Sequence, residues 1–240
     1  MVETNGAGAQ VANLEAGFEQ GVRLHQQGNL AAAEPIYREV LLWRPNHMGA
    51  LHLLGVIAHH TGRVELGVEL IRRAIGLNPD FAAAHSNLGN ALSDLKRPAE
   101  AIASFDRAIA LQPNYAEAHY NRGCVLLDLK RAAEALASYD RAIMLKPDYP
   151  KAYSNRGNVL SYLNRPAEAI ASFDRAIALQ PNFVEAYYNR GNVLQDLRRP
   201  ADALASYDRV IGLNPNIAQA YNNRGNALRD LMRPEAALES

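Results

Sequence analysis

The sequence has a single cysteine, Cys124, among its 240 residues. One cysteine excludes an intramolecular disulfide framework and most thiolate metal sites. Positive and negative side chains balance at 25 each, so no net charge attracts the chain to nucleic acid or to an anionic membrane. No run of about 18 apolar residues appears, and residues 1–13 lack the basic start and apolar core of a signal peptide. We therefore expect a cytoplasmic protein with neither nucleic acid nor a membrane as partner.

Motifs that carry catalysis are also missing from the sequence. It has no Gly-rich phosphate loop, no serine elbow, no His-Glu-x-x-His helix and no paired cysteines. His52 and His59 would share one helix face, but a metal would need ligands from another helix, and no Asp, Glu or Cys at ligand spacing completes the pair. The two histidines are better explained as solvated or peptide-contacting. The sequence thus predicts no enzyme activity, no metal and no cofactor.

What the sequence does have is proline and glycine at one fixed spacing. Proline recurs every 34 residues, at Pro45, Pro79, Pro113, Pro147, Pro181 and Pro215. Glycine keeps the same step at Gly21, Gly55, Gly89, Gly123, Gly157, Gly191 and Gly225. The segment RPAEAIASFDRAIALQPN occurs twice, at residues 97–114 and 165–182. A period of this size predicts stacked units that arose by duplication and share one conformation.

Within each unit the apolar residues follow a helical step. In the unit that starts at Ala82 they line one face of each of two helices. These residues are Leu88, Leu92, Ala101, Phe105 and Ala108. A proline suited to the first turn of a second helix recurs at Pro98, Pro166, Pro200 and Pro234. The residues expected to cap the next first helix are Asn46, Asp80, Asn114, Asp148, Asn182 and Asn216.

The unit resembles the tetratricopeptide repeat. Counted from the first residue of the unit, that consensus has glycine at place 8, small residues at places 20 and 27, an aromatic residue at place 24 and proline at place 32. The unit from Ala82 supplies them as Gly89, Ala101, Ala108, Phe105 and Pro113. The resemblance implies an all-α, right-handed superhelical solenoid of helix-turn-helix repeats. We predict repeats at residues 14–47, 48–81, 82–115, 116–149, 150–183 and 184–217, a truncated repeat at 218–240 and a flexible leader at 1–13.

The turn between the two helices changes along the chain. It has Gly28 and Gly62 in the first two repeats, and then Lys96, Lys130, Asn164, Arg198 and Met232. If the turn requires a left-handed backbone, each of these later residues except asparagine is strained by about 1–2 kcal/mol. If it is an ordinary helix end, none of them is. The sequence leaves both alternatives open.

The last repeat holds a complete first helix and only the start of a second. We therefore expect a longer protein, cut inside its repeat array. Leu228, Leu231 and Leu238 would then lack partners from a following repeat. This open C-terminal edge predicts self-association, by contact or by exchange of the last helix.

Asparagine recurs on the first helices. It occupies place 6 as Asn87, Asn121, Asn155, Asn189 and Asn223, and place 9 as Asn90, Asn158, Asn192 and Asn226. The resemblance implies that these places line the concave groove. Asparagine inside a helix is less favourable than alanine by about 0.5 kcal/mol, so its repetition requires a reason. We predict that these amides, which both donate and accept, bind the backbone of an extended peptide. Alternatively, they hydrogen-bond within the array or were copied by duplication.

Cys124 takes a place 9 that is asparagine in the neighbouring repeats, so we interpret it as a neutral replacement rather than a reactive thiol. Other recurring residues are charged. Arginine at place 7 is Arg122, Arg156, Arg190 and Arg224, and Asp-Arg pairs recur at 106–107, 140–141, 174–175 and 208–209. Together they predict inter-helix salt bridges with buried arginine stems. Aspartates at place 13, which are Asp94, Asp128, Asp196 and Asp230, would make the groove rim acidic and favour basic or Ser/Thr-rich peptides.

Two branches of the family sharpen the expected function. Carboxylate-clamp repeats, which bind chaperone tails, need Lys and Arg where this chain has Ser86 and Asn155, and only Asn90, Asn121 and Lys151 match. The repeated Asn-x-Gly-Asn is instead similar to the superhelical arm of O-linked N-acetylglucosamine transferase and its bacterial relatives. In those proteins the arm delivers polypeptide to a glycosyltransferase domain.

We therefore predict a non-catalytic protein-protein interaction module that binds an extended polypeptide in its concave groove. Two alternatives stay open. One is the substrate-recruiting N-terminal arm of a protein O-glycosyltransferase, whose catalytic domain is not part of this chain. The other is a self-assembling scaffold that uses the C-terminal edge.

Overall fold

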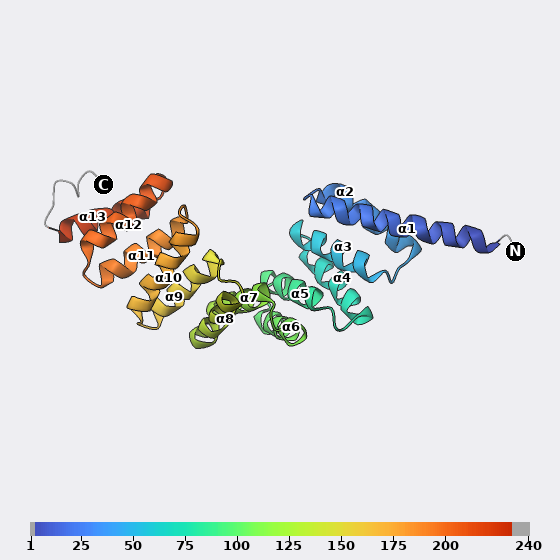
Figure 1. The fold of residues 1–240 in the computed structure, drawn as a ribbon, viewed down its shortest axis with the longest axis horizontal. Coiled ribbons are helices and arrows are strands. Elements are labelled where there is room, and N and C mark those ends of the chain that lie inside the picture. The colour runs from blue at the N-terminus through green and yellow to red at the C-terminus, as the bar shows by residue number, and fades with distance from the viewer. Residues whose placement is uncertain (1–2, 232–240) are drawn as a thin grey trace. The chain divides into compact units, whose positions relative to one another are not determined.

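Thirteen α-helices make up residues 3–231, the part of the chain that the computed structural model describes (Figure 1). They are α1 (Glu3–Gln26), α2 (Leu30–Trp43), α3 (Met48–His60), α4 (Val64–Leu77), α5 (Ala82–Asp94), α6 (Pro98–Leu111), α7 (Ala116–Asp128), α8 (Ala132–Leu145), α9 (Pro150–Tyr162), α10 (Pro166–Leu179), α11 (Val184–Asp196), α12 (Pro200–Leu213) and α13 (Ala218–Asp230). No strand occurs in this range. The predicted all-α fold of paired helices is confirmed.

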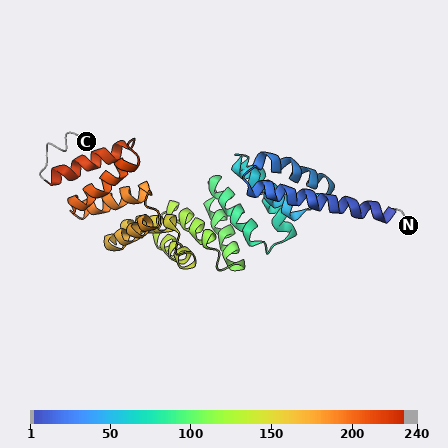
Figure 2. The same ribbon diagram turned by 45° about the horizontal axis from the view of Figure 1, so that its top comes forward.

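The chain folds into two compact units, one ending at Pro113 and the other beginning at Asn114. The first unit contains α1 to α6 and the second contains α7 to α13 (Figures 1 and 2). Inside each unit, every odd-numbered helix from α1 to α11 packs against the even-numbered helix that follows it. No helix within residues 3–231 combines the length and the apolar character needed to cross a bilayer.

In every described helix pair but that of the second repeat, a glycine of the first helix faces an aromatic ring of the second. A Cβ atom on Gly89 would lie 2.7 Å from Cε1 of Phe105, and one on Gly157 would lie 2.6 Å from Cε1 of Phe173. Both distances are shorter than any real contact, so only glycine allows this approach. Ala101 and Ala169 on the second helices are fully buried. The predicted division of labour, small residues for close approach and one ring to fill the gap, is confirmed.

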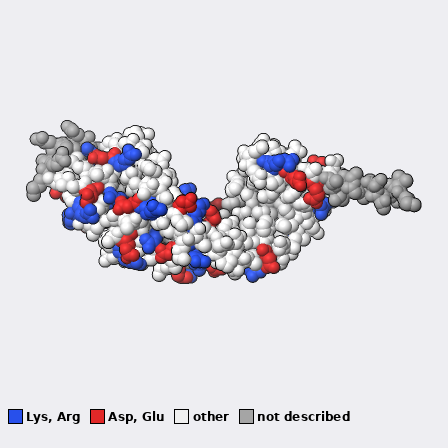
Figure 3. Space-filling view, viewed as in Figure 1, with Lys and Arg blue, Asp and Glu red and all other residues white. Residues whose placement is uncertain are grey.

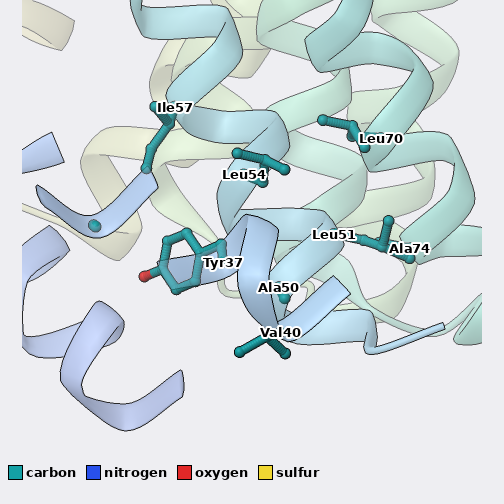
Figure 4. Close-up of a cluster of buried hydrophobic side chains, with 9 residues drawn as sticks. Tyr37, Val40, Ala50, Leu51, Leu54, Ile57, Leu70 and Ala74 are labelled. Carbon is teal, nitrogen blue, oxygen red and sulfur yellow. The ribbon is translucent and has the colours of Figure 1, made fainter. Parts of the chain in front are cut away.

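In the second repeat an aliphatic side chain, not an aromatic ring, packs against the glycine. Ile71 stands where the other repeats have an aromatic ring, and a Cβ on Gly55 would lie 2.7 Å from its Cγ1. The backbones of α3 and α4 come closer as a result, since a Cβ on Gly67 would lie 2.9 Å from the carbonyl oxygen of Gly55. Glycine instead of alanine at that place follows from this contact. The surrounding core joins Tyr37 of α2 to Leu51 and other apolar residues of α3 and α4 (Figure 4).

The turn between the helices of a repeat requires a left-handed backbone. Lys96 and Lys130 have φ of 59°, Asn164 and Arg198 have φ of 57°, and Gly28 and Gly62 have φ of 76° and 81°. The helix end shows why: Lys96 donates its N–H to Ser93 O, and Arg97 donates to Leu92 O, which closes the last turn. The first of the two alternatives is therefore correct for the described turns. Met232 lies outside the described residues.

The helix starts agree only in part with the sequence signals. Pro98, Pro166 and Pro200 occupy the first turn of α6, α10 and α12, as predicted, and Pro234 lies outside the described residues. The predicted asparagine and aspartate caps are wrong. The capping residue is one position later: Phe81, Tyr115 and Phe183 make no side-chain cap bond, whereas His47 accepts the N–H of Ala50. Asn78 and Asn214 instead accept the N–H of Asp80 and Asn216, each at 3.1 Å, and so shape the preceding turn.

Two expectations concern the ends of the chain. The backbone of residues 3–13, where the sequence predicted a flexible leader, continues α1. Alanine, glutamine and glutamate in this segment favour a helix, while Gly6 and Gly8 oppose it. At the other end, Leu228 is only 1% exposed. Leu228 is therefore not exposed at this edge as expected, Leu231 is partly buried, and Leu238 lies outside the described residues.

Candidate functional site

The recurring asparagines form hydrogen bonds that join one repeat to the next. In the second unit, Asn189 on α11 donates Nδ2–H to Oδ1 of Asn158 on α9, at 2.9 Å. Asn223 on α13 repeats the bond one period later, to Oδ1 of Asn192 on α11, at 3.0 Å. Place 6 of one repeat therefore donates to place 9 of the repeat before it. These contacts correspond to the alternative in which the amides hydrogen-bond within the array. Whether they can also bind a peptide depends on which donors and acceptors remain free.

Each of these bonds uses only some of the hydrogen-bond donors and acceptors of the asparagine side chain. An asparagine side chain has two N–H donors and an oxygen with two lone pairs. The bond to Asn158 takes one donor of Asn189, and both residues are partly rather than fully buried. A tied amide also has a fixed orientation, which lowers the entropy that a ligand contact would cost. The bonded pairs can therefore hold a ligand without first being ordered.

Tyrosine side chains also take part in this network, and the sequence did not predict their contacts. Tyr188 at place 5 accepts from Asn223 Nδ2 at 3.3 Å, and Tyr120 at the same place accepts from Asn155 Nδ2 at 3.2 Å. Tyr207 at place 24 donates its hydroxyl to Asn192 Oδ1 at 2.9 Å. The signal in the sequence was tyrosine at place 5 in every second repeat of this unit. Burial raises the pKa of Tyr207 to about 12, so its hydroxyl stays protonated and donates.

Cys124 takes the position of a place-9 amide in this network. Its Sγ lies 3.6 Å from Asn155 Nδ2 and 3.5 Å from the hydroxyl of Tyr139, and both groups donate to it. Burial raises the pKa of the thiol. A protonated, partly buried thiol is a poor nucleophile, which agrees with a neutral replacement.

The remaining predicted site residues have different surroundings. In the first unit, Asn87 Nδ2 lies 2.9 Å from Nε2 of His52, and Asn90 is partly buried on the same helix. In the second unit, Asn121 is partly buried on α7, and exposed Asn226 accepts from Arg229 within α13. The nine asparagines thus lie on α5 in the first unit and on α7, α9, α11 and α13 in the second.

The histidine pair separates into two unrelated contacts. His52 is 7% exposed and accepts from the Asn87 amide, while His59 Nε2 lies 2.6 Å from Asp94 Oδ2. Burial, with a smaller effect of His25, lowers the pKa of His52 to about 4. Across the described residues, no three His, Cys, Asp or Glu side chains are placed to hold a metal.

The predicted salt bridges between helices are present in the second unit. Arg156 Nε donates to Asp140 Oδ1 of the preceding repeat at 2.6 Å, and its NH1 donates to Ser172 Oγ of its own repeat at 2.7 Å. Arg190 makes the equivalent contacts to Asp174 and Ser206. The buried serine at place 23 was not anticipated from the sequence. On the face drawn in Figure 3, Lys or Arg lie beside Asp or Glu over the second unit.

Two hollows of the second unit adjoin the asparagine network. One has a volume of about 520 Å³ and is lined by Lys151, Phe183, Glu185, Tyr188, Asn189 and Ile217, among others. The other is smaller, about 150 Å³, and includes Asn158, Asn189, Asn192 and Asp196. Asn189 lines both. The amides that tie the repeats therefore also face open space.

The paired helices, the close glycine contacts and the hydrogen bonds between successive repeats define a helical repeat protein. Profiles of the tetratricopeptide repeat family match residues 18–82, 61–116 and 86–151, and a second profile of that family matches residues 150–183 and 184–217. The chain belongs to the tetratricopeptide repeat family. No curated protein sequence matches it.

Solved structures share the fold at low sequence identity. PilF of Pseudomonas aeruginosa has a TM-score of 0.77 at 19% identity, over 97% of this chain and 100% of its own. YrrB, a repeat protein with an unusual peptide-binding site, has a TM-score of 0.66 at 21% identity, over 77% of this chain and 95% of its own. MamA of Desulfovibrio magneticus has a TM-score of 0.66 at 19% identity, over 71% and 97%. These likenesses show the fold alone and carry no link to a glycosyltransferase.

Proposed function

We propose that this protein binds an extended polypeptide along the first helices of its repeats and performs no catalysis itself. The observation that carries the proposal is the position of Asn189, which is tied to Asn158 and at the same time lines two hollows. An amide held in place can donate to a peptide carbonyl or accept a peptide N–H without reading the side chain. That YrrB has a peptide-binding site on the same fold agrees with this role.

The experiment compares binding and stability in one variant. Asn121, Asn155 and Asn189 are changed together to alanine, and a library of extended peptides is screened against the variant and the wild type. We expect affinity to fall by about 0.5–1.5 kcal/mol for each neutral hydrogen bond lost. Stability is expected to fall as well, because Asn155 and Asn189 join repeats, although the better helix propensity of alanine offsets about 0.5 kcal/mol per site.

The control variant carries alanine at Asn46 and Asn114, two exposed asparagines outside the helices. It should bind as the wild type does. A folded triple variant that keeps full affinity for the selected peptides would refute the proposed role of the amides, whatever happens to its melting temperature.

Two other functions are proposed, and fewer observations support them. A role as the substrate-recruiting arm of a glycosyltransferase rests on the repeated Asn-x-Gly-Asn, and sequencing the gene beyond Ser240 tests it. Self-assembly through the C-terminal edge rested on unpacked leucines, and the burial of Leu228 removes part of that support. Light scattering over a concentration series separates a scaffold from a monomeric receptor.

A further inference from the structure

The larger hollow of the second unit has the size of a ligand site. Its volume of about 520 Å³ lies within the range of about 300–1,000 Å³ that is usual for such sites. Phe183, Tyr188 and Ile217 provide apolar surface inside it, and each is only partly buried. Amides of Gln180, Asn189 and Asn214 surround this surface.

The same places one repeat earlier are closed by an ion pair. There Glu117 at place 2 accepts from Lys146 Nζ at place 31, at 3.1 Å. Lys146 also lies over the ring of Tyr149, 5.0 Å from its centroid, and Tyr149 contacts Tyr120 at 4.8 Å between centroids. Charge and apolar surface are both satisfied within the protein at this position.

In the hollow the lysine at place 31 is replaced by neutral amides. Place 31 is Gln180 in the fifth repeat and Asn214 in the sixth, while place 2 is Lys151 and Glu185. Within residues 3–231, neither Lys151 nor Glu185 forms an ion pair, and both are exposed. An unpaired cation and an unpaired anion therefore flank one apolar surface, with a donor-bearing amide, Asn189, beside it.

We propose that this hollow, as part of the peptide surface proposed above, binds a peptide segment with an acidic, a large apolar and a basic side chain at alternate positions. The acidic side chain pairs with Lys151 and the basic one with Glu185, while the apolar one packs on Phe183, Tyr188 and Ile217. Alternate side chains of an extended chain point to one face about 7 Å apart, which lets three of them enter together. Asn189 donates its second amide hydrogen to the peptide backbone.

The test uses two blocked heptapeptides of identical composition. One carries Glu, Phe and Lys at alternate positions in that order, and the other carries them in the reverse order, with serine between and glycine at both ends. The wild type is expected to prefer one order about tenfold, because two matched pairs replace two like-charge contacts. The double variant Lys151→Glu/Glu185→Lys is expected to prefer the other order by a similar factor. Both preferences should shrink at high salt.

A matched control swaps the charges of the pair one repeat earlier. Glu117→Lys/Lys146→Glu keeps an internal ion pair and should leave the peptide preference unchanged. A second variant, Lys151→Met/Glu185→Met, should bind both peptides equally. Since Lys151 and Glu185 are exposed, circular dichroism is expected to show all variants folded.

The outcomes separate this inference from the broader function. Failure of both heptapeptides to bind, or equal binding of both by the wild type and the charge-swapped variant, overturns the inference. The proposed function survives that result if library peptides still bind and still depend on Asn155 and Asn189. Loss of all peptide binding overturns both.

Discussion

At place 7 of the repeat the first unit carries Leu54 and Leu88, whereas the second carries Arg122, Arg156, Arg190 and Arg224. Both leucines are 7% exposed and pack without polar partners. Arg156, Arg190 and Arg224 occupy the same place, and each pairs its charge with an aspartate of the preceding repeat. The repeat thus accepts either side chain, provided that the charge finds a partner. In the second unit, the ion pairs between successive repeats therefore require an aspartate in the repeat that precedes each arginine.

The two units also differ at place 9. In the second unit the residue there accepts a hydrogen bond from the hydroxyl of the tyrosine at place 24. Tyr207 donates to Asn192, and Tyr139 donates to Cys124. In the first repeat, place 9 is Val22, which cannot accept, and the buried hydroxyl of Tyr37 has no partner among the described residues. Asn192 therefore has a structural task, because the ring at place 24 of its repeat carries a hydroxyl.

The largest expected effect is on the free energy of unfolding, and it distinguishes the apolar residue at place 7 of the first unit from the arginine at place 7 of the second. Leu88→Ala should lower the free energy of unfolding by about 2–5 kcal/mol, with no dependence on salt. Arg190→Ala should cost less, about 1–2 kcal/mol, because its contacts are partly exposed, and the loss should diminish at high salt. Urea unfolding at two salt concentrations measures both. Equal salt dependence in the two variants would remove the distinction drawn between the units.

The next effect is a pH dependence confined to the first unit. The pKa of His52 is lowered from 6.5 to about 4 by burial, so the unfolded chain binds its proton first as the pH falls. Stability is therefore complete above about pH 6.5 and is lost as the pH drops towards about 4. The slope is about 1.4 kcal/mol per pH unit, or about 3 kcal/mol in total.

His52→Tyr provides the comparison, because tyrosine occupies this place in Tyr120 and Tyr188. Amide hydrogen exchange of α3 and α5 between pH 7 and about pH 5 measures the effect. The variant should lose the pH dependence while its second unit behaves as in the wild type. A wild-type α3 that is equally protected across this range would contradict the prediction.

The smallest effect has opposite signs in the two units. Tyr207→Phe removes a hydroxyl that donates to Asn192 and should cost about 1 kcal/mol. Tyr37→Phe removes a buried hydroxyl that has no described partner and should leave stability unchanged or raise it by up to about 1 kcal/mol. Thermal unfolding of the two variants decides. A similar loss in both would show that the Tyr37 hydroxyl has a partner in solution.

The sequence predicted the paired helices because proline, glycine and the apolar step all repeat in one register. It also predicted the Arg–Asp contacts, since both partners recur with the same period. It did not predict the helix caps, because the turn places Phe81 rather than Asp80 at the helix start. Nor did it show which partner each asparagine takes. A period reveals that Asn189 recurs, whereas the contact with Asn158 depends on how one repeat is rotated against the next.

The central claim is that these amides contact a peptide, and their own N–H₂ signals test it most directly. In ¹⁵N-labelled protein, the side-chain resonances of Asn155, Asn158, Asn189 and Asn192 are recorded before and after addition of a library-selected peptide. We expect these four to shift in a saturable way, together with Tyr188, while Asn46 and Asn114 stay unchanged. Saturable binding that leaves the four amide signals in place, and shifts residues of the second helices instead, would contradict the account.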